Sequence, residues 1–302
     1  MRIVIIGGMG LIGRAVTEMA TAKGHFVVVT SRTTHSAGAV SGNVVRQQWD
    51  GKSAEDLRPI IDGLDAVINL AGESIGKGLW TSKRKAELLQ SRLVPAQALV
   101  EALKLCQEPP QTLIQASAIG YYGTGTDEKD EDSTPGTDYL AKFAAQWEES
   151  TKAVEELGIR RVIIRSGIVL QKGEGVLTQL MLPFKLMVGG PVGSGKQIFS
   201  WIHIRDEAAA ILYLLKKSEF SGVFNLTAPK PKSNSDMGRV IAKAMRRPYW
   251  MPVPGFALKL LLGEMSTLVL DGQKVMPKRL LEAGYIFCFD DLEEAVSDLL
   301  KK

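Results

Sequence analysis

The sequence contains 302 residues with a net charge of +4, and 45% of them are hydrophobic while 23% are charged. This composition is typical of a globular protein and excludes a fibrous or disordered chain. The mild positive charge comes without a basic stripe interleaved with aromatic residues, so we expect no nucleic-acid partner. No run of eighteen apolar residues occurs, so we expect no membrane-spanning helix. Two distant cysteines, Cys106 and Cys288, lack metal-ligand spacing and favour a cytoplasmic protein without a metal site.

The first 165 residues alternate short β-branched segments with amphipathic segments of helical length, which is typical of βαβ units and a parallel sheet. We predict strands at 3–6, 26–30, 44–49, 66–70, 112–116 and 161–165. Helices are predicted at 11–23, 53–61, 83–104 and 139–157, from apolar residues spaced three and four apart. Asp138 is placed to cap the last of these helices.

Beyond residue 165 the pattern is less regular. A strand and helix are predicted within 201–217, a strand at 223–227, and helices at 235–245, 256–262 and 291–300. We expect residues 1–170 to form the larger domain, completed by about 201–228. Residues 171–200 and 229–302 are expected to form a small C-terminal substrate lobe packed closely against it, because no linker separates the two.

Three glycines follow the first predicted strand at the spacing GxxGxxG and lead directly into a helix. Gly7 permits a tight turn, Gly10 lets the backbone approach a pyrophosphate, and Gly13 lets the helix pack close to the strand. Leu11 and Ile12 open the helix, whose amino end supplies N–H donors and partial positive charge. This context predicts a dinucleotide site in a Rossmann fold, with a purely structural turn as the alternative.

The end of the second predicted strand indicates which dinucleotide binds. An acidic residue there would accept the ribose 2′-hydroxyl of NAD, but the chain has Ser31 and Arg32, which suit the 2′-phosphate of NADP(H). The alternative is that Arg32 is a solvated loop arginine. Asp50, at the end of the third strand, is the expected acceptor near the adenine.

Four further segments extend the pattern: 69–72 (Asn-Leu-Ala-Gly), 117–123 (Ser-Ala-Ile-Gly-Tyr-Tyr-Gly), 166–170 (Ser-Gly-Ile-Val-Leu) and 201–206 (Trp-Ile-His-Ile-Arg-Asp). With the glycine turn, they resemble the extended short-chain dehydrogenase/reductases over nearly the whole chain. More narrowly, the chain resembles their atypical, epimerase-like family with a C-terminal segment of unknown function, here about 247–296. Some members carry an old cell-division-inhibitor label. The resemblance implies a doubly wound, mostly parallel seven-stranded sheet, bound NADP(H) and a small lobe over the nicotinamide.

The resemblance also implies roles for individual residues. Ser117 would lie beside the nicotinamide. The expected cofactor-binding residues after the later strands are Leu70, Ala71, Gly72, Ala116 and Ser166.

The chain departs from the superfamily at its usual catalytic pair, Tyr-x-x-x-Lys, whose lysine lowers the pKa of the tyrosine. The expected helix begins at Tyr139, but Phe143 stands four residues later, and Lys142 is displaced by about 100° around the helix. Tyr121 or Tyr122 can supply a phenol near the nicotinamide, and packing in the pocket wall is the alternative for both.

Other features are expected to be structural. His203 precedes a helix that Asp206 can cap, and a structural histidine is favoured over a proton shuttle. The acidic residues within 127–132 are expected to form a solvated edge of the active-site mouth. Residues 190–196 match GxxxxGK, but Gln197 replaces the Ser/Thr that binds Mg²⁺, which favours a loop of the substrate lobe.

These features predict a monomeric or homodimeric enzyme that moves hydride between NADP(H) and a small carbonyl or nucleotide-sugar-like substrate. Ser117 and Tyr121 or Tyr122 would orient the carbonyl oxygen. The alternative, motivated by the displaced lysine, is a non-catalytic NADP(H)-sensing regulatory or binding protein.

Overall fold

The computed structural model describes residues 1–32 and 38–301. A central sheet of eight strands organises the fold. In spatial order they are β12 (Gly222–Leu226), β8 (Arg160–Ser166), β6 (Thr112–Ala118), β5 (Ala66–Asn69), β1 (Arg2–Ile6), β2 (Phe26–Ser31), β4 (Val44–Gln48) and β3 (Gly38–Ser41). Seven of them are parallel, and the edge strand β3 pairs antiparallel with β4. The predicted seven-stranded, mostly parallel sheet is confirmed, with β3 added at its edge.

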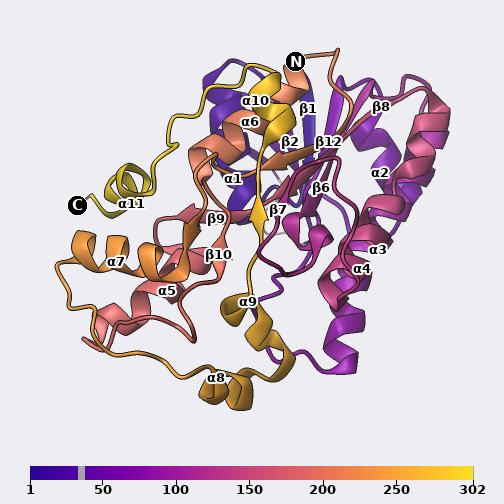
Figure 1. The fold of residues 1–302 in the computed structure, drawn as a ribbon. Coiled ribbons are helices and arrows are strands. Elements are labelled where there is room, and N and C mark those ends of the chain that lie inside the picture. Colours follow the sequence, from indigo (N-terminus) through magenta and orange to yellow (C-terminus); the bar gives the residue numbers. More distant parts are fainter. Residues whose placement is uncertain (33–37, 302) are drawn as a thin grey trace.

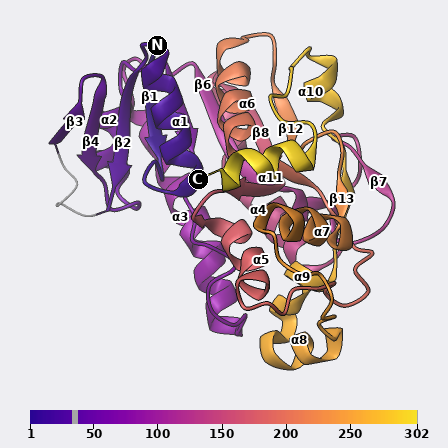
Figure 2. The same ribbon diagram turned by 90° about the vertical axis from the view of Figure 1, so that its left-hand side faces the viewer.

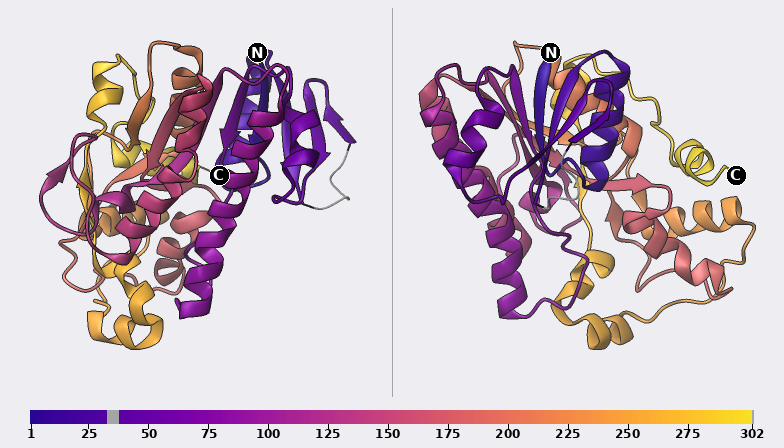
Figure 3. Two further views of the ribbon diagram at one scale, coloured as in Figure 1. Left: turned by 90° about the vertical axis from the view of Figure 1, so that its right-hand side faces the viewer. Right: turned by 180° about the vertical axis from the view of Figure 1, so that it is seen from behind.

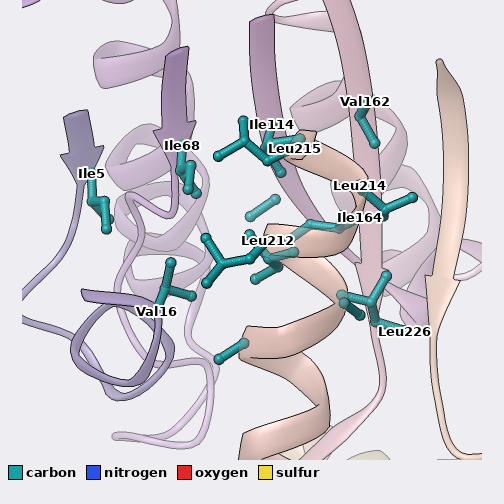
Figure 4. Packing of buried hydrophobic residues seen from close by; sticks show 14 of the residues in the cluster. Ile5, Val16, Ile68, Ile114, Val162, Ile164, Leu212, Leu214, Leu215 and Leu226 are labelled. Carbon is teal, nitrogen blue, oxygen red and sulfur yellow. The ribbon is translucent and has the colours of Figure 1, made fainter. Parts of the chain in front are cut away.

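Helices cover both faces of the sheet, so the strand side chains that point to either face are apolar. Side chains alternate along β1: Ile3 and Ile5 join one hydrophobic cluster, while Val4 and Ile6 join another. Helices α1 (Leu11–Ala22) and α6 (Ile204–Lys216) pack on the first face, where Figure 4 shows Leu212 and other α6 side chains against the strands. The opposite face carries α2 (Ala54–Ile61), α3 (Ser82–Leu105) and α4 (Tyr139–Glu149).

The helix predicted at 139–157 is in fact two elements. Asp138 caps α4 as predicted, because its carboxylate accepts the N–H of Ala141 at 2.9 Å. The α-helix ends at Ser150, whose hydroxyl donates back to the carbonyl of Trp147, and the chain continues as a 3₁₀ helix, η3 (Lys152–Leu157). Serine and threonine favour such breaks because their hydroxyl groups compete for backbone hydrogen bonds.

A smaller lobe lies at the carboxyl end of the parallel strands (Figures 1 and 2). Its core surrounds Trp201, which is fully buried and donates its indole N–H to the carbonyl of Lys230. The elements of this region are β9 (Ile168–Gln171), α5 (Gly175–Lys185), β10 (Ile198–Phe199), β11 (Trp201–His203), β13 (Lys232–Ser233), α7 (Asn234–Met245), α8 (Gly255–Leu262), η4 (Gly263–Ser266), α9 (Thr267–Leu270) and α11 (Leu292–Leu300).

The chain between α9 and α11 returns to the edge of the central sheet. There β14 (Lys274–Val275) pairs with β7 (Glu128–Lys129), and α10 (Lys278–Glu282) packs against β12. Arg279 donates to the carbonyl of Val223 at 2.6 Å. This segment is therefore shared between the proposed domain and the proposed lobe. Among the described helices, none combines the length and hydropathy needed to cross a bilayer.

The packing of α6 on the sheet can be tested by truncating Leu214, which is fully buried. We expect Leu214→Ala to lower the free energy of unfolding by about 2–5 kcal/mol, because it removes apolar contacts and leaves a cavity. Urea denaturation of the purified protein measures this change. Leu260→Ala is the matched control, since Leu260 is 86% exposed on α8 and its loss should change stability little. Equal effects of the two substitutions would contradict this packing.

Candidate functional site

The glycine turn joins β1 to α1 with contacts too close for other residues. Gly7 has φ +76°, and a β-carbon there would lie 2.7 Å from the carbonyl oxygen of Leu70. A β-carbon on Gly13 would lie 2.5 Å from the Cα of Gly8. Gly10 is the N-cap of α1 and no side chain caps the helix, so the N–H groups of its first turn remain available to an anion. This cradle fits a pyrophosphate.

The segment after β5 lies directly beside this turn. Leu70 donates its N–H to the carbonyl of Ile6, and Ala71 donates its N–H to the side chain of Asn69 at 3.2 Å. Gly72 follows with φ +156°, and a β-carbon there would lie 2.9 Å from the guanidinium carbon of Arg92. The residues expected to line the cofactor after β5 are thus next to the glycine turn.

The residues expected at the adenosine end come from the ends of β2 and β4. Ser31 is half-buried and its carbonyl accepts the N–H of Trp49, which brings the two strand ends together. Arg32 is exposed. Asp50 is exposed as well, and its Oδ1 accepts the N–H groups of Ser53 and Lys52, which lower the pKa of its carboxyl. Asp50 therefore shapes the turn before α2, a role that the sequence did not indicate.

A pocket of about 190 Å³ lies where β6 and β8 end, between the sheet and the lobe. Its walls come from the turn after β6, the ends of β8 and β10, one face of α4, and the segment 267–273. They are mainly apolar, with Arg92, Ser166 and Ser200 among the polar lining residues. A ligand held by the glycine turn and extending past Gly72 would reach this pocket, because Arg92 lines the pocket and leaves no room for a β-carbon on Gly72.

The face of α4 that meets the pocket is entirely apolar. It consists of Leu140, Phe143, Ala144 and Trp147. Tyr139, the expected start of the catalytic pair, points elsewhere, since its ring packs against Trp80 at 5.3 Å between centroids. Two pairs of pocket-facing positions are spaced four residues apart, Leu140 with Ala144 and Phe143 with Trp147, and neither pair contains a tyrosine or a lysine.

The three residues expected to be catalytic form a buried polar network instead. Arg165 makes two hydrogen bonds of 2.8 Å to the carboxylate of Glu148, and Ser117 donates its hydroxyl to the same carboxylate at 2.6 Å. Tyr122 accepts from Arg165 at 2.9 Å and donates to Asn225 at 2.7 Å. The ring of Tyr121 stacks on the Arg165 guanidinium at 3.4 Å.

The catalytic roles of Ser117, Tyr121 and Tyr122 stay predictions, and this network gives each residue a structural contact as well. None of the three lines the pocket. Ser117 and Tyr122 are buried, and burial raises the pKa of Tyr122 to about 12. A phenol with so high a pKa keeps its proton at neutral pH, so Tyr122 acts here as a hydrogen-bonding group. Their contacts with Arg165 are those of packed side chains, as in the alternative to a catalytic role.

Ala116 and Ser166, the remaining predicted cofactor-binding residues, differ in whether they line the pocket. Ala116 lies in the buried part of β6 and does not line the pocket, whereas Ser166 does line it. The Ser166 hydroxyl donates to Glu207 Oε1 at 2.5 Å. Glu207 is fully buried in the first turn of α6, its Oε2 has no hydrogen-bond partner in the described structure, and burial raises the pKa of its carboxyl to about 8. The carboxyl is therefore mainly protonated at neutral pH.

Sequence reasoning missed Arg92, which stands in the middle of α3. It is 8% exposed, and its Nη1 and Nη2 donate to the carbonyls of Leu88 and Glu73 at 3.0 and 2.9 Å. The rings of Phe143 and Trp147 lie 4.9 and 4.7 Å from its guanidinium. No local motif marks Arg92, because a single arginine in a polar helix is typical of a solvated surface.

Two expectations near α6 have mixed outcomes. His203 is structural as favoured: it is 1% exposed, stacks on Phe289 at 4.0 Å, and burial lowers its pKa to about 4. It also caps α6 by accepting the N–H of Arg205, so the prediction that Asp206 is the cap is wrong. Asp206 is buried and instead accepts the N–H groups of Cys288 and Phe289, which attaches the C-terminal segment.

The acidic loop is solvated only in part, since Asp127, Glu128 and Asp132 are exposed, and none of its acidic residues lines the pocket. Glu131 is 9% exposed and accepts the N–H groups of Asn225 and Arg279, while Asp130 and Asp132 both pair with Lys278. These contacts fasten α10 to the larger domain. Residues 190–196 form a loop between α5 and β10, as favoured for this GxxxxGK match. The described residues contain no cluster of metal-ligating side chains.

The doubly wound sheet, the glycine turn and the pocket at the carboxyl edge define a Rossmann-fold dinucleotide-binding protein of the extended short-chain dehydrogenase/reductase class. The chain belongs to the NAD dependent epimerase/dehydratase family, whose model matches residues 3–227. A domain of unknown function, DUF1731, matches residues 253–299. Both halves of the resemblance seen in the sequence are therefore confirmed.

Three relatives show the extent of the similarity. Epimerase family protein YfhF of Bacillus subtilis is 38% identical over 302 residues, covering 99% of this chain and 98% of that protein. The crystal structure of human epimerase family protein SDR39U1 with NADPH has 32% identity and a TM-score of 0.89, covering 99% of both chains. A nucleoside-diphosphate sugar epimerase from Corynebacterium glutamicum has 28% identity and a TM-score of 0.78, covering 99% of this chain and 58% of that one.

The buried carboxyl of Glu207 predicts a specific dependence of stability on pH. Its pKa rises from 4.5 to about 8 on folding. Between these values the folded state holds a proton that the unfolded state has released, so stability falls as pH rises, by up to about 1.4 kcal/mol per pH unit. We expect Glu207→Gln to flatten this fall between pH 6.5 and 8.

Urea denaturation at several pH values measures the effect. Glu219→Gln, at an exposed position after α6, is the control and should keep the wild-type slope. Parallel stability profiles for the wild type and Glu207→Gln would show that Glu207 does not hold a proton near neutral pH.

Proposed function

We propose that this protein binds NADP(H) and transfers hydride between the bound coenzyme and a small molecule held in the pocket. The observation that carries the proposal of NADP(H) binding is the glycine cradle, where a side chain at Gly7 or Gly13 would collide with backbone atoms. The uncapped amino end of α1 would hold the pyrophosphate through the N–H groups of Leu11 and Ile12. The similarity to a human protein crystallised with NADPH supports the same coenzyme.

Discrimination between the two coenzymes is assigned to Ser31 and Arg32. The exposed guanidinium of Arg32 follows β2 at the position where an acidic residue would select NAD. A charge-assisted hydrogen bond to the 2′-phosphate contributes about 1.5–3 kcal/mol. Asp50 is kept as the proposed neighbour of the adenine, with Oδ1 already bound to backbone N–H groups.

Replacing Arg32 tests this assignment. We expect Arg32→Gln to weaken NADPH binding by about ten- to a hundredfold and to leave NADH binding unchanged, because only NADPH carries the 2′-phosphate. Titration of coenzyme fluorescence measures both affinities. Arg239→Gln, on the exposed surface of α7, is the control and should bind both coenzymes like the wild type. A similar loss of affinity for NADPH and NADH would show that Arg32 does not discriminate between the two coenzymes.

The pocket favours a small substrate over a nucleotide sugar. Its volume of about 190 Å³ lies below the range of about 300–1,000 Å³ typical of pockets for drug-sized ligands. The bound coenzyme supplies hydride at its nicotinamide. The apolar face of α4 excludes water. Ser166 also lines the pocket, and its hydroxyl is hydrogen-bonded to the protonated carboxyl of Glu207, which can supply a proton. We propose that these groups, and not Ser117 or the two tyrosines, contact the substrate.

One observation favours the second candidate, a non-catalytic NADP(H)-sensing protein. The pocket face of α4 has neither the tyrosine nor the lysine that transfers protons in this superfamily. The two functions are separated by incubating the protein with NADPH and a panel of small aldehydes, ketones and oxo acids while following NADPH absorbance. We expect oxidation of NADPH by at least one member of the panel. Gly10→Val, which crowds the amino end of α1, is the coenzyme-deficient control and should show none.

Tight NADPH binding without oxidation across the panel would favour the sensing function. Absence of NADPH binding by the wild type would overturn both candidates.

A further inference from the structure

Arg92 is a buried cation at the junction between the glycine turn and the pocket. It extends from α3, which runs along the outside of the sheet and past its carboxyl edge (Figure 3). Its guanidinium lies so close to Gly72 that a β-carbon there would come within 2.9 Å of it, and Arg92 also lines the pocket. A charge in this place costs free energy unless something compensates it, because burial removes its hydration.

The compensation present in the protein is incomplete. Among residues 1–32 and 38–301, no carboxylate forms an ion pair with Arg92, and the buried Nε has no hydrogen-bond partner. Two backbone carbonyls and the Ser91 hydroxyl accept from Nη1 and Nη2, and two aromatic rings face the charge. Burial lowers the pKa of Arg92 to about 10, which still leaves the guanidinium charged at neutral pH.

Arg165 shows how the same fold treats a buried arginine that serves structure. Its guanidinium makes two hydrogen bonds to the carboxylate of Glu148, and a third to Tyr122. Both members of that ion pair are buried and mutually neutralised. Arg92 is buried like Arg165, but no carboxylate of the described residues neutralises its charge. Buried charges in proteins are ordinarily paired.

We propose that Arg92 binds a carboxylate carried by the substrate, so that the pocket selects small carboxylic acids with an apolar body. This inference rests on the proposed function and names its substrate class. Guanidinium and carboxylate are matched in shape and charge, and the pair is strongest where water is excluded. The apolar walls from Leu140, Phe143 and Ala144 would contact the rest of the molecule.

Two acidic residues also border the pocket and do not oppose this assignment. The Asp138 carboxylate accepts the N–H groups of Ala141 and Thr124, and the Asp271 carboxylate accepts the hydroxyl of Thr267. Asp138 is half-buried and Asp271 is exposed. Both charges are therefore held by donors at the rim, whereas Arg92 is the buried charge in the wall.

The test compares carboxylates with their neutral amides. Propanoate and pyruvate, with propanamide as the uncharged isostere, are titrated calorimetrically into the wild-type protein with and without saturating NADPH. We expect both carboxylates to bind and propanamide to bind at least about tenfold more weakly, since it cannot pair with the buried charge. Arg92→Met should abolish the difference between propanoate and propanamide, and Arg92→Lys should retain part of it.

Two further measurements keep the result decisive. Near-ultraviolet circular dichroism establishes that each variant is folded, and Lys104→Met, at an exposed position of the same helix, should bind like the wild type. In the wild type, propanoate should also shift the NMR resonance of the Arg92 Nε–H, assigned by its absence in Arg92→Lys. Equal affinities for carboxylate and amide, or carboxylate binding retained in Arg92→Met, would overturn the proposal. Loss of NADPH binding alone would instead overturn the proposed function, because the titrations without coenzyme still decide the role of Arg92.

Discussion

The buried ion pair between Arg165 and Glu148 holds the carboxyl edge of the sheet together. Arg165 comes from β8 and Glu148 from α4, and the hydrogen bonds that surround them reach β6 through Ser117 and β12 through Tyr122 and Asn225. A buried pair is stable only when both charges and the remaining donors are satisfied, and removing one partner strands the other. This pair therefore anchors α4 to the end of β8.

The same network engages both tyrosines of the sequence motif. Tyr121 and Tyr122 follow β6, the position where the superfamily presents reactive groups, yet one covers the Arg165 charge and the other bonds to it. Asn225, which accepts from Tyr122, also donates to the carbonyl of Met276. Asn225 thus connects the C-terminal segment to the buried network of the larger domain.

The site divides into two ends with different chemistry. Backbone geometry defines the dinucleotide end, where glycines and a helix terminus create space and donors for an anion. Buried side chains define the pocket end: a cation that pairs with no carboxylate of the described residues, a protonated carboxyl behind a serine, and an apolar helix face. In the proposed reaction, a small substrate would meet these groups at the nicotinamide.

The sequence by itself determined the sheet, the order of helices and strands, and the dinucleotide turn, because these depend on local properties. Alternation of apolar residues specifies strands and helices, and positive φ at Gly7 is required by a turn only a few residues long. Only the tertiary structure decided the pocket. Successive side chains on a helix differ in direction by about 100°, so Leu140 lines the pocket wall while Tyr139 packs against Trp80. Arg92, Ser166 and Glu207 acquire their chemistry from burial beside residues distant in the chain, and sequence spacing contains no record of that burial.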